Sequence, residues 1–266
     1  MCTVVLLRRP GHDWPLLIAA NRDEMHDRPW RPPDRHWPDR PDVIAGLDEL
    51  AGGSWFGLND HGVIAAILNR RNTLGPLPGM RSRGELVLDA LDHADARAAA
   101  EAIADLDAHA YRGFNLIIAD QDAAFWVRST GPDGPARPDV AKIAAGLSMI
   151  TAGDLDDPRD PRIARYLPRW RTAPPPDPGR GAWTHWEALL ESRDSDADGR
   201  GAMCFRLGTG FGTVSSTLVA VPDARKSAAR HAALRFAQGH PDAIVWRDIP
   251  TTPVPGSVAT LPTRTV

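Results

Sequence analysis

The feature that most constrains this chain is an apolar segment that recurs on both sides of a short breaker cluster near the N-terminus. Residues 3–9 (TVVLLRR) are rich in Val and Leu, residues 10–15 contain two prolines and a glycine, and residues 16–22 are apolar again. Such a pattern predicts a β-hairpin. A turn centred near residues 11–14 pairs positions whose numbers sum to about 25. Cys2 is therefore expected opposite Asp23, to within a residue or two.

The same pattern recurs along the chain and alternates with helical segments in blocks. Further strands or hairpins are predicted at 51–69, 114–129, 142–152, 202–221 and 231–248, and helices at 83–106, 162–170 and 183–192. Residues 25–41 are predicted to be a loop, and Ser82 and Glu85 to form a capping box at a helix start. Because strands do not alternate singly with helices, antiparallel sheets with segregated helices are favoured over a parallel sheet. One domain over residues 1–266 is expected, with a Pro/Thr-rich tail from about residue 250.

Composition excludes several classes of function. The net charge of -3 gives no electrostatic footprint for nucleic acid. The two cysteines, Cys2 and Cys204, form no disulfide framework, which favours a reducing compartment. The N-terminus lacks the basic region of a secretory signal, and the apolar runs are too short to span a bilayer. No zinc-ligand spacing is present. We therefore expect a cytoplasmic protein with no metal, no integral membrane association and no required cofactor.

Cys2 is the residue with the clearest chemical potential. An initiator Met is normally removed before a small residue, and removal here would leave a thiol and a free α-amine on one residue. The α-amine titrates near pH 8 and can act as the base for its own thiol. The predicted hairpin also brings the cluster Asn21-Arg22-Asp23-Glu24 to the same end. The alternative is structural: Cys2 is a small hydrophobe at the start of a strand, and the cluster is a solvated strand end.

Several motifs resemble those of the NRDE family, the transport and Golgi organisation 2 homologues. They are MCT at 1–3, NRDE at 21–24, GGSWFG at 52–57, Asn59 with Gly62, RSRGE at 81–85 and GFNL at 113–116, with GTVSST at 212–217 as a fainter match. The chain also resembles, more distantly, the N-terminal-nucleophile (Ntn) hydrolases of the choloylglycine hydrolase and penicillin V acylase type. Those enzymes share the Met-Cys start and an N-x-x-G…L-N segment, here Asn59 to Gly62 and Leu68-Asn69. This resemblance implies an αββα sandwich of two antiparallel sheets flanked by helices.

The resemblance to the hydrolases also implies roles for particular residues. Cys2 is the expected nucleophile, Asp23 is expected to hold its amine, Arg22 to lie beside the thiolate, and Asn69 to donate to the oxyanion. The remaining expected substrate-binding residues come from the same motifs: Asn21, Glu24, Trp55, Asn59, Arg83 and Asn115. Two departures stand out. The arginine follows Asn21 instead of preceding it, and Leu147-Ser148-Met149 stands where the hydrolases carry an Asn.

Two functions therefore compete at the level of sequence. The first is hydrolysis or transfer of an acyl group at an amide or thioester bond, carried by Cys2. The second is non-catalytic binding and trafficking of haem or acyl-CoA, because members of the NRDE family have been connected with haem trafficking and with acyl-CoA and lipid homeostasis. In that case the partner is a small-molecule ligand, including noncovalent haem. The nine tryptophans are consistent with an apolar pocket.

Overall fold

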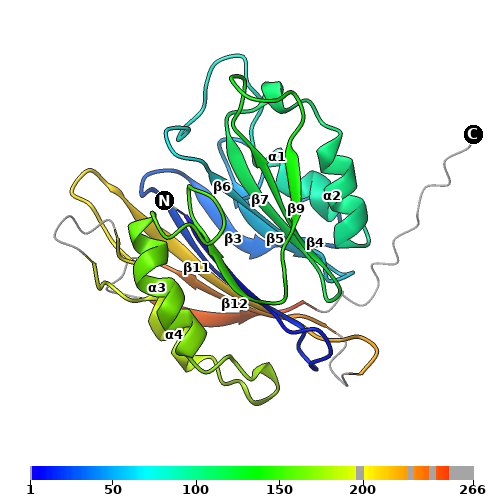
Figure 1. Cartoon of the computed structure of the whole chain (residues 1–266), viewed down its shortest axis with the longest axis vertical. Coiled ribbons are helices and arrows are strands. Elements are labelled where there is room, and N and C mark those ends of the chain that lie inside the picture. The colour runs from blue at the N-terminus through cyan, green and yellow to red at the C-terminus, as the bar shows by residue number, and fades with distance from the viewer. Residues whose placement is uncertain (1, 196–200, 227–230, 240–243, 252–266) are drawn as a thin grey trace, which may run out of the picture.

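The structure, a computed structural model, describes residues 2–195, 201–226, 231–239 and 244–251. Its centre consists of two antiparallel sheets packed face to face (Figure 1). The six-stranded sheet has the order β10 (Gly146–Ile150), β1 (Thr3–Arg8), β2 (Leu16–Met25), β11 (Phe211–Val221), β12 (Ala233–Gln238), β13 (Val245–Ile249). The seven-stranded sheet has the order β3 (Trp30–Asp34), β4 (Val43–Asp48), β5 (Phe56–Asn59), β6 (Ile64–Asn69), β7 (Phe114–Ala119), β8 (Ala124–Ser129), β9 (Asp139–Lys142).

Helices cover the outer face of each sheet, as Figure 1 shows. Helices α1 (Glu85–Leu91) and α2 (Ala96–Ala104) pack on the seven-stranded sheet, and α3 (Pro161–Thr172) and α4 (Thr184–Leu190) pack on the six-stranded sheet. The layers are therefore α, β, β and α, and the predicted αββα architecture is confirmed. None of the helices in the described part of the chain is both long and apolar enough to cross a membrane.

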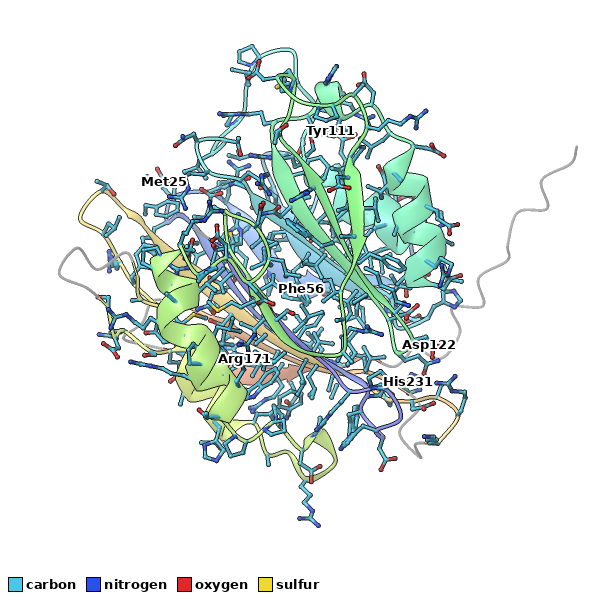
Figure 2. The ribbon with its side chains drawn as sticks, viewed as in Figure 1. Met25, Phe56, Tyr111, Asp122, Arg171 and His231 are labelled. Atoms are coloured by element: carbon cyan, nitrogen blue, oxygen red, sulfur yellow. The ribbon has the colours of Figure 1, made fainter. Side chains whose placement is uncertain are left out.

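Strand alternation divides the apolar residues of the first hairpin between two cores. Val4, Leu6 and Ile18 face the interior between the sheets, where Phe56 also lies (Figure 2), whereas Leu17 faces α3 and α4. Cys2 continues the first of these faces and packs against the core between the sheets.

The predicted register of this hairpin is confirmed to within one residue. Thr3 pairs with Asn21 and Leu7 with Leu17, so paired numbers sum to 24 rather than about 25. Extending this register by one residue sets Cys2 opposite Arg22, with Asp23 next along the strand.

The segment predicted to be a loop at residues 25–41 contains a strand, β3. It lies at the edge of the seven-stranded sheet and pairs only with β4. An edge strand tolerates Pro32 and Pro33 because one side of its backbone needs no ladder partner. Composition alone therefore gave the wrong prediction here.

The prediction of a strand at residues 202–207 is also wrong. β12 pairs with β11 only from Ser215 onward, so the first residues of β11 keep one free edge. Residues 205–207 lie along that edge: the N–H of Thr213 donates to the carbonyl of Phe205 at 2.9 Å, and the N–H of Leu207 donates to that of Phe211 at 2.8 Å. This pairing is limited to one isolated bridge, between Arg206 and Gly212, and does not extend into a strand. The predicted pairing of the last two strands, β12 and β13, is confirmed. The predicted tail lies outside the described residues from position 252 onward.

The predicted capping box at Ser82 and Glu85 does not form. Gly84 is the N-cap of α1, the Ser82 hydroxyl accepts from the Gly84 N–H at 3.2 Å, and the Glu85 carboxylate pairs with Arg81. The backbone carbonyl of Gly84 is held by the N–H of Ser54 at 3.0 Å. The chain before α1 is thus fixed by a tertiary contact rather than by a local box.

Candidate functional site

Cys2 lies at one end of the interface between the sheets, on the floor of a cavity of about 210 Å³. We call this cavity the Cys2 pocket. The cysteine is half-buried, and its thiol donates to the backbone carbonyl of Asp23 at 3.6 Å. Arg22 and Asp23 also line the pocket. The hairpin therefore brings together the three residues whose meeting the sequence predicts.

Arg22 is the most unusual side chain in the pocket. It is 5% exposed, and its guanidinium lies 4.2 Å from the centre of the Trp55 ring. Its Nη2 atom is 3.9 Å from Asp48 and 4.0 Å from Glu24, whereas its Nη1 atom has no hydrogen-bond partner among the described residues. Burial lowers the pKa of Arg22. The Nη1 atom is itself buried, so its N–H groups lack a partner inside the described part of the protein.

The Trp55 ring can hold the Arg22 guanidinium in place because the ring is itself packed against Gly46. A Cβ atom at Gly46 would lie 2.3 Å from the Trp55 indole, so the ring rests directly on the glycine backbone. Trp30 adds a second aromatic ring 5.9 Å from the Arg22 guanidinium. An aromatic face stabilises a desolvated guanidinium by about 2 kcal/mol. Trp55 is therefore placed to hold Arg22 as well as to line the pocket.

The Asp23 carboxylate contacts residues of α3 and β11. Its Oδ2 atom forms an ion pair with Arg162 at 3.0 Å, and its Oδ1 atom accepts from Thr213 at 2.8 Å. Arg162 also donates to the Thr3 hydroxyl at 2.8 Å. This network links α3 and β11 to the two strands that carry the candidate site. The predicted contact of Asp23 with the amine of a processed Cys2 stays a prediction.

Arg162 is the residue that sequence reasoning missed. It lies 139 positions from Asp23 along the chain, so no local motif connects them. The available signal was an arginine on the apolar side of an amphipathic helix, next to Ile163 and Tyr166. A charged residue there is buried, and a buried charge requires a partner.

The Cys2 thiol is not activated in the environment that the structure shows. Burial, and then the charge of Asp23, raise the pKa of Cys2 from its ordinary value of 9.0. The thiol is therefore protonated near neutral pH. Burial also raises the pKa of the other cysteine, Cys204, to about 11.

Four of the other predicted site residues line the pocket: Asn69, Glu24, Trp55 and Arg83. Asn69 comes from the end of β6, and Glu24 follows Asp23 on β2. Arg83 comes from the loop before α1 and donates to the carbonyls of Thr73 and Gly113 at 2.8 and 3.0 Å.

Three predicted substrate-binding residues do not line the Cys2 pocket, and their role in binding a substrate stays a prediction. The amide of Asn21, which lines a smaller cavity beside Cys2, donates to the carbonyls of Leu190 and Met203. The amide of Asn59 donates to the carbonyls of Leu91, the last residue of α1, and His93. The amide of Asn115 donates to Thr151 and Gly153 at the end of β10. All three side chains hold backbone segments together.

Met149 stands on β10 opposite Val5. Both side chains pack in the core beneath α3 and α4, on the far face of the six-stranded sheet from the pocket. A side chain at position 149 therefore does not face Cys2. The described residues contain no group of three or more His, Cys, Asp or Glu placed to hold a metal ion.

Solved structures with this arrangement define the class to which the fold belongs. A mutant conjugated bile acid hydrolase from Clostridium perfringens superposes with a TM-score of 0.52 at 12% identity, covering 94% of this chain and 92% of that one. The penicillin V acylase from Agrobacterium tumefaciens gives a TM-score of 0.50 at 12% identity, covering 93% and 86%. The chain thus has the fold of the Ntn hydrolases.

Sequence comparison places the chain within a family. The family model for Transport and Golgi organisation 2 matches residues 1–164, and the chain belongs to this family. It is 36% identical over 109 residues to a mouse Transport and Golgi organization 2 homolog, covering 40% of this chain and 38% of the mouse protein. The human homolog is 35% identical over 113 residues, covering 41% and 40%. The chain therefore covers about two fifths of the length of these relatives.

Proposed function

We propose that this protein hydrolyses or transfers an acyl group at an amide or thioester bond, with Cys2 as nucleophile. The observation that carries the proposal is the shared pocket of Cys2 and Arg22, in which the Nη1 atom of Arg22 has no partner among the described residues. An attacking thiolate and a cation are the two groups that acyl transfer needs side by side. The Ntn-hydrolase fold supports the same chemistry as an analogy.

The proposed reaction begins after Met1 is removed, when the α-amine of Cys2 is free. That amine takes the thiol proton, and Sγ attacks the acyl carbon. Arg22 and Asn69, which both line the pocket, are assigned to the carbonyl oxygen as it becomes negative. The carbon–nitrogen or carbon–sulfur bond then breaks, and the leaving group takes the proton back. Water attacks the resulting thioester on Cys2 and releases the acid.

Removal of Met1 is essential to this proposal because of the thiol pKa. Because burial and the charge of Asp23 raise the pKa of the Cys2 thiol, little of it is ionised near neutral pH. A free ammonium group on the same residue adds a nearby positive charge and lowers that pKa. The processed chain is therefore expected to carry a reactive thiolate that the unprocessed chain lacks.

The test is alkylation with iodoacetamide across pH 5–10, mapped by mass spectrometry on two chains. One chain is processed to Cys2, and the matched control carries a Lys inserted after Met1, which blocks removal. We expect Cys2 of the processed chain to react below pH 7 and Cys2 of the control to react only above pH 9. Equal profiles in the two chains would overturn the activated nucleophile.

A second experiment tests turnover itself. Hydrolysis of a panel of acyl-CoAs is followed by release of the free thiol, and hydrolysis of N-acyl amino acids by release of the amine. Cys2→Ala is expected to lose turnover, and Cys204→Ala, the matched control, to retain it. Turnover that survives in Cys2→Ala would contradict the proposal.

One observation favours a second function, the non-catalytic binding of haem or acyl-CoA. The Asp23 carboxylate is engaged by Arg162 and Thr213, and the Cys2 pKa is raised. A pocket whose thiol stays protonated binds a ligand without attacking it. Titration with haem, followed at the Soret band, and calorimetry with palmitoyl-CoA test this function. Binding by the processed chain without turnover would favour it, and no signal with either ligand would exclude both ligands.

A further inference from the structure

Two arginines lie together at the rim of the Cys2 pocket and hold the same loop. Arg83 donates to the carbonyl of Thr73 at 2.8 Å, and Arg112 donates to that of Leu74 at 2.6 Å. Both also reach the carbonyl of Gly75, at 3.4 and 3.1 Å. The two guanidinium groups therefore converge on one short stretch of backbone.

Among the residues that the structure describes, no carboxylate lies within ion-pair distance of these two arginines. Neither Arg83 nor Arg112 forms an ion pair within 4.0 Å among the described residues, although both line the pocket. In contrast, Arg28 at the same pocket pairs with Asp48 at 2.8 Å, and Arg81 pairs with Glu85. Carbonyl dipoles satisfy the N–H groups of the rim pair but do not neutralise its charge.

This arrangement disfavours the charged form of Arg83. Burial and then the charge of Arg112 lower the pKa of Arg83 to about 10. Two like charges held together in a partly buried site repel each other, and an anion placed between them removes that repulsion. An arginine pair is also the best match for the oxygens of a phosphate or carboxylate.

A second and independent observation points to an anionic or oxygen-rich ligand in the same pocket. Arg22, which lines the pocket and is 5% exposed, has a buried Nη1 atom without a hydrogen-bond partner among the described residues. The arginines that line the pocket therefore include Arg22 beside the thiol as well as Arg83 and Arg112. Three carboxylates also line the pocket, and each is near another arginine: Asp48 pairs with Arg28, Asp23 with Arg162, and Glu24 lies 3.8 Å from Arg28 and 4.0 Å from Arg22.

The loop held by the rim arginines also presents apolar side chains. Leu74 is 50% exposed and Leu77 is 48% exposed, and Leu77 and Met80 both line the pocket. Exposed leucines beside unpaired cations form a surface suited to an amphiphile, with an anionic end and an apolar chain.

We infer that Arg83 and Arg112 form an anion subsite for the phosphate or carboxylate end of an amphiphilic ligand, whose apolar part contacts Leu77 and Met80. The inference deepens the proposed function by naming the class of its ligand, and it rests on that function only for what Cys2 then does to the ligand. Binding at the subsite does not require Cys2 to react.

The test is calorimetric titration of the Cys2→Ala chain, which lacks the proposed nucleophile, with three probes of equal chain length: octyl phosphate, octanoate and neutral octanol. We expect the two anions to bind at least tenfold more tightly than octanol and to lose affinity as salt rises from 50 to 500 mM. The stronger of the two anions identifies the headgroup. Equal affinity for octanol and both anions would overturn the inference.

Variants separate the subsite from general charge effects. Arg112→Gln is expected to weaken anion binding at least tenfold, and the matched control Arg137→Gln, on an exposed arginine outside the pocket, to leave it unchanged. Arg83→Lys, which keeps the charge, serves as the second variant and is expected to lose less affinity than Arg83→Gln. Equal affinities in Arg112→Gln and Arg137→Gln would refute the subsite.

The same measurements distinguish this inference from the proposed function. Anion binding that depends on Arg112, together with a processed chain that turns over no acyl substrate, would support the subsite and reject the acyl transfer. Turnover that depends on Cys2 but is unaffected by Arg112→Gln and by salt would do the reverse.

Discussion

Replacing Arg162 by Met tests the buried ion pair beneath the candidate site. The two side chains are 2% and 0% exposed, and Arg162 Nη1 lies 3.0 Å from Asp23 Oδ2. At an effective dielectric constant of about 20, two charges at this distance attract each other by about 5 kcal/mol. Removal of the cation leaves a buried carboxylate whose Oδ1 atom still accepts from Thr213. We expect the free energy of unfolding to fall by about 3–5 kcal/mol, which lowers Tm by about 10 °C.

The assay is urea unfolding of four chains: wild type, Arg162→Met, Asp23→Asn and the double variant. Because either single change leaves one buried polar group without its main partner, the double variant should be at least 1 kcal/mol more stable than the sum of the single losses predicts, within the range of about 0.5–3 kcal/mol for contacting groups. Arg137→Met, which removes an exposed pair with Asp105, is the control and should cost less than about 1 kcal/mol. A cost below 1 kcal/mol for Arg162→Met, or an additive cycle, would refute the reasoning.

Three further predictions concern a buried thiol, a close contact of a glycine with an aromatic ring, and a buried amide. Because the pKa of Cys204 is raised to about 11, its thiolate should be scarce until the pH approaches that value; alkylation of the folded chain should rise steeply only above pH 10, and rapid reaction at pH 8 would contradict its burial. Gly46→Ala adds a Cβ that meets Trp55 at 2.3 Å, so unfolding should become easier by about 1–3 kcal/mol with a change in tryptophan emission; an unchanged emission spectrum would argue against the contact. Asn59→Ala deletes an amide that donates to two backbone carbonyls and accepts from two N–H groups, so thermal unfolding should show a loss of about 2–4 kcal/mol; a loss below 0.5 kcal/mol would show that water replaces it.

The first hairpin shows which part of the candidate site can be predicted from residues that are close together in the sequence. Apolar runs flank a turn that fixes the register, so the meeting of Cys2 with Arg22 and Asp23 depends only on the first 25 residues. Periodicity likewise predicted α3, α4 and the pairing of β7 with β8. These elements are defined by their own residues, which is why sequence suffices for them.

Other parts depend on contacts that no local pattern encodes. β3 is a strand because β4 offers it an edge, whereas the predicted pairing of residues 202–207 with β11 is limited to one bridge because β12 occupies that edge from Ser215 onward. Asn59 and Asn115 carry recognisable motifs, but their amides serve as backbone anchors. A motif records that a residue type is required, and the structure decides whether a ligand or the backbone requires it.

The contact between Gly53 and Gly84 has a consequence for how this pocket can change. A Cβ at Gly53 would lie 2.5 Å from the backbone of Gly84, and this close approach fixes the chain immediately beside Arg83. The position of Arg83 therefore depends on Gly53 and Gly84, two residues without a side chain. Loop residues such as Leu74 and Leu77 are exposed and can vary without disturbing this contact. A side chain at Gly53, in contrast, would have to displace the Gly84 backbone, and one at Gly84 would meet the Ser54 backbone at 3.1 Å. The two glycines therefore constrain the position of Arg83, whereas the leucines can change the apolar surface that a ligand contacts.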